Sequence, residues 1–353
     1  MFQLKPSTKT AICIGTGGVG KTTFATMLAL GKASEGQKVL VLTIDPSLRL
    51  AQALGLPKDG EVHQINHSAI GKKSGQLFGC ILDPKKAFQE FISSAAGNRL
   101  ASADIDKLTT NKLYQELSTN LSGSQEFTSL FKLNQFVQSG QYDLVILDTP
   151  PAQHTWQFLK APEKLSQLFN EGVAQWFRSA AKEDVGFFKK IVNAGTLQVL
   201  KALEVLTGAD FVKELSLFFK AIQNWQEPLQ AKVNDCHRLL TSQQTEFILV
   251  TALDSSRIQE SHKISHEILM EGYNLTSLVI NRSLSWLDES LASSHPKIND
   301  ILNYYKQIEK NIIALSDDKR FQRLSVYKTP EVSQNDWHVE TLYEVYNQIH
   351  FLR

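Results

Sequence analysis

The chain has 353 residues, of which 42% are hydrophobic and 21% are charged. These values fit a folded protein with one large domain, or a large domain that carries an insertion, and argue against disorder and coiled-coil rods. Lys and Arg (37) nearly balance Asp and Glu (36), so the net charge of +1 gives no support for a nucleic acid partner. The longest apolar runs are far below the ~18 residues of a membrane span, and no secretory signal is recognised. We therefore expect a cytoplasmic protein with no transmembrane segment.

Seven short apolar runs predict strands. Several of them are apolar on both faces, which is typical of a mostly parallel sheet flanked by helices. A helical stretch that ends near Gly36 separates the first two runs, so the chain begins with a βαβ unit. The runs cover residues 10–14, 38–44, 77–82, 144–147, 247–251, 277–280 and 324–327. The expected fold class is therefore α/β.

Two long stretches, 85–138 and 157–243, have helical spacing and no strand pattern. We expect them to form a helical subdomain inserted into a sheet domain made of residues 1–84, 139–156 and 244–353. The second stretch is rich in aromatic residues, which could line a groove for a client. Their helical spacing and the three methionines of the chain favour an ordinary core. These aromatic residues are Phe169, Trp176, Phe177, Phe187, Phe188, Phe211, Phe218, Phe219 and Trp225.

A glycine-rich segment, residues 15–22, satisfies the pattern GxxxxGK[ST] directly after a predicted strand and before a predicted helix. Glycines let the backbone fold closely around phosphate oxygens, so that N–H groups and the helix N-terminus point at the anion. Lys21 is expected to place its charge on the β and γ phosphates, and the Thr22 hydroxyl to bind Mg²⁺. The alternative is a glycine-rich turn with an incidental lysine.

Two acidic residues end predicted strands, where open α/β sheets place their ligands. Asp45 follows the run 38–44 and could orient an attacking water, or could simply cap a helix that begins at Pro46. Asp148 follows the run 144–147 and fits a Walker B aspartate, which reaches Mg²⁺ directly or through a water.

Together these motifs resemble the family of the arsenical-pump ATPase and the tail-anchored-protein targeting ATPase. That family belongs to the dimeric P-loop class with a deviant Walker A motif. The resemblance rests on five segments, namely GTGGVGKTT, TIDPSLRLAQALG, DTPPAQHT, VINR and TPE. It covers most of the chain and implies a homodimer that binds ATP and Mg²⁺.

The resemblance also implies roles for single residues. Asp45 would position the hydrolytic water, and Thr22 and Asp148 would hold Mg²⁺. His154 would lie in the switch that senses the γ phosphate, or would simply be a histidine at a helix start. Asn281 would recognise adenine, although a satisfied polar residue at a strand end is the alternative. The residues expected to bind nucleotide are Gly17, Gly18, Val19, Gly20, Lys21, Thr22, Thr23, Asn281 and Pro330.

The chain departs from the family pattern at several positions. Thr16 replaces the signature lysine that reaches the partner's phosphates, and Gln153 replaces a switch glycine. Arg49 is the candidate for a substitute catalytic cation, or else a solvated helix arginine. The three cysteines, Cys13, Cys80 and Cys236, form no CxxC pair, so we expect buried thiols, no zinc and no metalloid site.

Two functions follow from these observations. The first is an ATPase that closes as a homodimer around two Mg·ATP and acts on an unknown protein or membrane-protein client. The alternative is a nucleotide-gated binding module for a hydrophobic or protein client, with negligible turnover.

The final segment, residues 339–352, is amphipathic and could contact a membrane. Its polar face has few basic residues, so we expect a helix packed on the sheet.

Overall fold

The computed structural model describes most of the chain. The described residues are 1–44, 54–66, 68, 75–96, 111, 114–115, 124–149, 152–168, 217–219, 225–283, 296–314, 321–331 and 338–353. Contacts divide the chain into two units, one of residues 1–82, 136–155 and 241–353, and one of residues 83–135 and 156–240. The assignment of an ATPase function to one part and of a subdomain role to the other stays a prediction.

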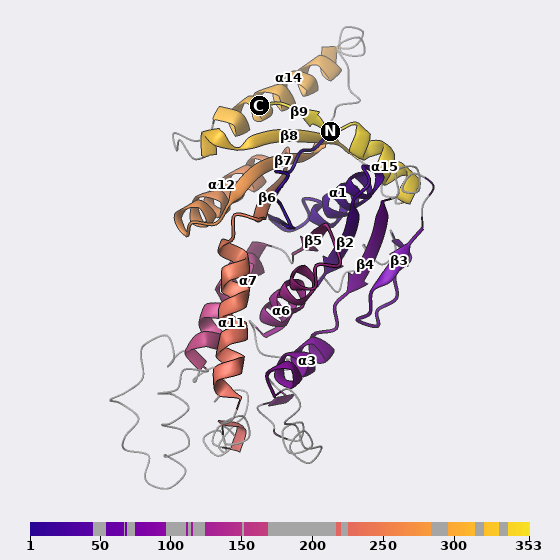
Figure 1. The fold of residues 1–353 in the computed structure, drawn as a ribbon. Coiled ribbons are helices and arrows are strands. Elements are labelled where there is room, and N and C mark those ends of the chain that lie inside the picture. The colour runs from indigo at the N-terminus through magenta and orange to yellow at the C-terminus, as the bar shows by residue number, and fades with distance from the viewer. Residues whose placement is uncertain are drawn as a thin grey trace, which may run out of the picture. The chain divides into compact units, whose positions relative to one another are not determined.

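The first unit contains a nine-stranded sheet with the strand order β3-β4-β2-β5-β1-β6-β7-β8-β9 (Figure 1). Seven strands correspond to the predicted runs and pair in parallel. They are β1 (Thr10–Gly15), β2 (Lys38–Thr43), β4 (Gln76–Ile81), β5 (Leu144–Asp148), β6 (Thr245–Ala252), β7 (Leu275–Ser283) and β8 (Ser325–Pro330). The prediction of an α/β fold with a mostly parallel sheet is confirmed.

Short antiparallel strands form the two edges of the sheet. β3 (His63–Ile65) pairs with β4, and β9 (His350–Phe351) pairs with β8. Sequence reasoning missed both, because runs of two or three residues carry too little periodicity to be recognised.

Helix α1 (Lys21–Ser34) follows the glycine-rich segment and lies in the interior of the first unit. Its residues from Lys21 to Ala33 are all buried, and it packs on β1, β2, β4 and β5. Helix α15 (Val339–Asn347) lies along α1 (Figure 1). The ring of Tyr346 packs directly on Gly31, where an added Cβ would come within 2.1 Å of the ring. Position 31 therefore has no room for any side chain.

The prediction of one helix over residues 339–352 is wrong at its C-terminal end. The helix ends at Asn347, and the chain continues into β9, where Phe351 lies opposite Tyr327. Edge pairing with β8 satisfies backbone groups that another helical turn would have used. The helix itself contacts α1 and β8, so its apolar face is covered within the protein.

Among the described residues of the first unit, two further helices are α12 (Ser255–Met270), which packs on β6 and β7, and α14 (Pro296–Ala314). A short 3₁₀ helix, η5 (Phe321–Arg323), follows α14. None of the helices that the structure describes is long and apolar enough to cross a membrane.

The described part of the second unit is helical. It includes α3 (Pro84–Ala96) and most of α6 (Ser124–Gln138), α7 (Ala152–Leu168) and α11 (Gln226–Thr241). Aromatic rings from α3 and α6 pack together in its interior, with Phe91 edge-on against Phe127 and Phe131. Of the aromatic residues considered above for a client groove, Phe218, Phe219 and Trp225 are buried, which favours the core interpretation for these three. The other six lie outside the described residues.

Candidate nucleotide site

The glycine-rich segment connects the end of β1 to the start of α1 at the carboxyl edge of the parallel sheet. Gly20 caps α1 with a φ of 89°, in the left-handed region that favours glycine. Gly15, with a φ of 151°, lies against β6, where an added Cβ would be 2.1 Å from the Val250 carbonyl oxygen. The first turn of α1 contains no acidic residue, so the positive end of the helix dipole faces the loop unopposed by a carboxylate of that turn. The backbone of the glycine-rich segment and of the first turn of α1 is therefore suited to binding an anion.

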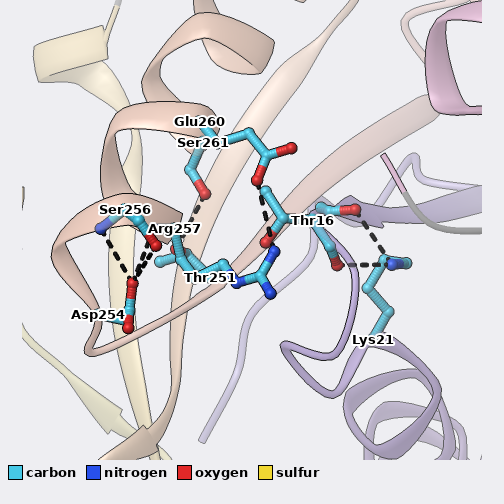
Figure 2. A network of polar contacts seen from close by, with 9 residues as sticks. Thr16, Lys21, Thr251, Asp254, Ser256, Arg257, Glu260 and Ser261 are labelled. Carbon is cyan, nitrogen blue, oxygen red and sulfur yellow. Dashed lines mark hydrogen bonds and ion pairs between the residues drawn. The ribbon is translucent and has the colours of Figure 1, made fainter. Parts of the chain in front are cut away.

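The Lys21 ammonium group is buried and turned back toward its own loop. Nζ donates to the carbonyl oxygens of Gly15 at 3.1 Å and Thr16 at 3.0 Å (Figure 2). Lys21 is 7% exposed, so its charge is held in a poorly solvated place where its attraction to an anion is strong. Thr16 is fully buried and brings no charge to the loop.

Asp148 joins three elements at this edge. It ends β5, opposite Cys13 of β1 and Thr43 of β2. Its Oδ2 accepts hydrogen bonds from Thr22 Oγ1 at 2.7 Å and from Thr43 Oγ1 at 3.0 Å. Asp148 has no exposed surface. Buried hydroxyl and carboxylate oxygens are ligands that Mg²⁺ prefers, so Thr22 and Asp148 fit the predicted Mg²⁺ site, which stays a prediction.

The charge of Asp148 also acts on Cys13. Burial, and then the neighbouring carboxylate, raise the pKa of the Cys13 thiol well above its usual value, while Lys21 lowers it in part. The Cys13 side chain, on β1 just before the loop, is therefore an uncharged thiol. Cys80 and Cys236 are likewise buried thiols outside any disulfide, so the expectation of buried thiols is confirmed.

Asn281 lies on the other side of the glycine-rich loop, near the end of β7. Its Nδ2 donates to the carbonyl oxygens of Val19 at 2.9 Å and Gly20 at 3.4 Å, and its Oδ1 accepts from the Thr329 hydroxyl. Pro330, the residue after Thr329, is buried at the end of β8. The structure thus brings Asn281 and Pro330 to the same sheet edge as the loop, and their adenine contacts stay predictions.

A further polar cluster follows β6 at the same edge (Figure 2). Asp254 caps α12 by accepting from the backbone N–H groups of Ser256 and Arg257. The hydrogen bond from the Ser256 hydroxyl has the largest effect in lowering the pKa of Asp254, and these N–H groups lower it further. The carboxylate that caps α12 therefore stays ionised. Arg257 forms a 3.5 Å ion pair with Glu260, and both are partly exposed. Such a pair adds little stability.

Three of the predicted residues fall outside the described part of the chain, wholly or with their side chains. Asp45 and Arg49 lie outside the described residues. His154 falls within the helix α7, and its side chain lies outside the described part.

Sequence reasoning missed the roles of two threonines, Thr43 and Thr329, which hold Asp148 and Asn281. Both lie within or next to recognised motifs at strand ends, and that placement is the signal that could have found them.

The sequence model of the anion-transporting ATPase family, ArsA, matches residues 8–350 of the chain. The chain is similar to the ATPase get3 of Aspergillus terreus, with 24% identity over 277 residues, 76% of this chain and 72% of the relative. It is also similar to the ATPase GET3 of Malassezia globosa, with 25% identity over 288 residues, 79% of this chain and 73% of the relative. With the ATPase ARSA1 of Chlamydomonas reinhardtii it shares 26% identity over 283 residues, 76% of this chain and 34% of that longer protein. A match over nearly the whole chain, together with the phosphate loop and Asp148 at one sheet edge, places the protein in the ArsA family of anion-transporting ATPases.

Proposed function

We propose that this ArsA-family ATPase hydrolyses ATP with the help of Mg²⁺, closes as a homodimer, and couples its nucleotide state to the binding of a protein or membrane-protein client. The observation that carries the chemical part is the grouping of Lys21, Thr22 and Asp148 at one buried sheet edge. The homodimer and the client rest on the family resemblance.

Phosphoryl transfer to water needs positioning and charge stabilisation more than covalent chemistry. Lys21 would exchange its two bonds to loop carbonyls for bonds to the β and γ phosphates. Thr22 and Asp148 would hold Mg²⁺, which supplies positive charge to the phosphates when bound. Asp45 would orient the attacking water. Burial of Lys21 and Asp148 keeps bulk water from screening these charges.

Nucleotide binding is tested by Lys21→Ala, with Lys38→Ala as a matched control. Lys38 begins β2, at the amino edge of the sheet, where its ammonium lies over the rings of Phe78 and Tyr142. Mg·ATP at a hundred times its Kd should stabilise the wild type by about 2.7 kcal/mol and so raise its melting temperature. We expect the same shift in Lys38→Ala and none in Lys21→Ala. An unchanged shift in Lys21→Ala would remove the phosphate-loop assignment.

Turnover separates the ATPase from a binding module without catalysis. Asp45→Asn should keep ATP binding and lose hydrolysis, because it removes the water-orienting carboxylate and leaves the phosphate loop intact. If turnover stays within a factor of about three, Asp45 is only a helix cap. If the wild type binds Mg·ATP without measurable phosphate release, the binding module is the better description.

A further inference from the structure

The side chain amide of Asn281 connects the phosphate loop to strand β8. Both of its polar atoms are used, with Nδ2 shared between the carbonyls of Val19 and Gly20, and Oδ1 accepting from Thr329. Asn281 is 3% exposed and Thr329 has no exposed surface. These bonds therefore form away from water, where losing a partner leaves a buried polar group unsatisfied.

The backbone of β7 explains how this amide is placed. Ile280 lies opposite Lys328, whereas Ser283 lies opposite Pro330, so β7 has one extra residue in this interval. Arg282 has a φ of 57°, which marks it as the extra residue of a β-bulge. The regular ladder to β8 thus ends just before Asn281, and the amide is free to bridge from Thr329 to the loop.

The orientation of the amide is defined by its partners. If Asn281 were flipped, its oxygen would face two carbonyl oxygens, which cannot donate a hydrogen bond. The observed orientation gives each carbonyl an N–H donor and leaves Oδ1 to the Thr329 hydroxyl. The two carbonyls therefore select this orientation, and the Thr329 hydroxyl, which can donate or accept, donates to the oxygen that remains.

The two carbonyls belong to the residues directly before Lys21. Gly20 O also accepts the hydrogen bond from Phe24 N at 2.9 Å in the first turn of α1. The amide lies so close to the Gly20 Cα that an added Cβ would be 2.2 Å from Nδ2. Asn281 thus contacts the point where the loop becomes the helix that carries Lys21 and Thr22.

We infer that Asn281, held at its oxygen by Thr329, is a positioning residue for the phosphate loop and acts on phosphate binding even when the ligand has no base. This role differs from the adenine contact that the resemblance implies. It rests on the proposed function only in taking residues 15–22 as the phosphate site. Loss of the amide donor would free the Val19 and Gly20 carbonyls and loosen the turn that places Lys21 and Thr22.

The test compares Asn281→Asp, Thr329→Val and the control Asn274→Asp in the full chain. Asn274 precedes β7 at its other end, and its Nδ2 also donates to two backbone carbonyls, of Gln243 at 3.4 Å and Thr245 at 3.0 Å. Asn281→Asp keeps the shape and replaces the donor with an acceptor, and Thr329→Val keeps the shape and removes the hydroxyl. Thermal melts show whether each variant folds.

Two measurements are made on each variant. The first is hydrogen exchange of the backbone amides of residues 17–24 without nucleotide. We expect faster exchange in Asn281→Asp and, to a smaller extent, in Thr329→Val, with no change in Asn274→Asp. The second is titration calorimetry with inorganic tripolyphosphate and with ATP, both with Mg²⁺. We expect Asn281→Asp to weaken both ligands by the same factor, about tenfold or more, and Thr329→Val, which adds no charge that could repel phosphate, to weaken both by a smaller common factor.

The outcomes are distinct. Unchanged exchange in both Asn281→Asp and Thr329→Val, or weaker ATP binding with unchanged tripolyphosphate binding, overturns the positioning role and leaves a contact with the base alone. If the wild type binds neither ligand, the proposed function fails, while the exchange measurement still decides whether Asn281 holds the loop.

Discussion

The Thr22 hydroxyl donates to Asp148 Oδ2 across 2.7 Å, although the two residues are 126 positions apart in the chain. Thr22 lies in the first turn of the helix after β1, and Asp148 ends the neighbouring strand β5. Both residues are buried, so little reorganisation separates this arrangement from one in which their oxygens share a cation. The two predicted Mg²⁺ ligands are therefore preorganised by the pairing of β1 with β5.

Asp148→Asn should raise the Mg²⁺ concentration needed for half-maximal ATP hydrolysis by about tenfold or more, because a neutral amide is a much poorer ligand for a hard cation. Binding of ATP without Mg²⁺ should change less than about threefold. The matched control is Asp143→Asn, just before the other end of β5, where an exposed carboxylate accepts from the Lys38 backbone N–H and the same change should have a small effect. An unchanged Mg²⁺ titration in Asp148→Asn would contradict the metal assignment.

Arg49→Ala should slow hydrolysis about tenfold or more, a loss of about 1.4 kcal/mol of transition-state stabilisation, with ATP affinity little changed. The reason is that Thr16 cannot supply the charge of the missing lysine. Arg257→Ala is the comparison, since this arginine lies at the same sheet edge and forms a partly exposed ion pair with Glu260. A slower rate in Arg257→Ala alone would move the role of substitute cation to α12.

Light scattering of the wild-type protein tests the proposed homodimer. Because Thr16 replaces the signature lysine, dimerisation with Mg·ATP should be weaker than in relatives that keep that lysine. A strict monomer with Mg·ATP and with a transition-state analogue would exclude the dimer.

The cysteines should resist modification in the folded protein. Burial raises the pKa of Cys236, and burial together with the Asp148 carboxylate raises that of Cys13, so at pH 8.5 both stay protonated and poorly nucleophilic. Mass spectrometry after iodoacetamide treatment should find these two unmodified until guanidinium is added. Rapid labelling of Cys13 in the native protein would show that its surroundings open.

Arsenite or antimonite should leave turnover unchanged, because soft metalloids need clustered thiolates. The three cysteines lie on β1, β4 and α11, and no group of three or more potential metal-binding His, Cys, Asp or Glu residues occurs in the part of the chain that the structure describes. Stimulation that is lost in Cys→Ser variants would reverse this expectation.

Gly31→Ala should destabilise the fold by about 2 kcal/mol or more, because the new methyl group would overlap the Tyr346 ring. In an open helix position the same change is favourable by ~1 kcal/mol. Urea unfolding measures the difference. Adding Tyr346→Leu should recover part of the loss, and Tyr346→Phe, which removes only the 2.7 Å bond to Glu35, should not. Additive effects in the double variant would mean that the two positions do not couple.

Sequence reasoning found most of the architecture because buried parallel strands have long apolar runs and the phosphate loop has a strict pattern. Residues 10–15 and 144–148 are examples, since both strands are buried throughout. It failed where tertiary contacts decide the structure. The turn from α15 into β9 depends on the exposed edge of β8, and the hydrogen bonds of Asn281 depend on a bulge at Arg282. Neither contact leaves a local pattern, so neither was predictable from composition or spacing.

The central place of β1 has a consequence for the synthesis of the protein. β1 ends at residue 15, but its two partners in the sheet, β5 and β6, begin at residues 144 and 245. As the chain emerges from the ribosome, β1 therefore cannot pair until both neighbouring strands have been made. Helix α1 gains its contact with Tyr346 later still. ATP cannot help the early chain to fold, because its phosphate loop has no support until most residues have been made. Chaperones would therefore be needed most by nascent chains that do not yet include β6.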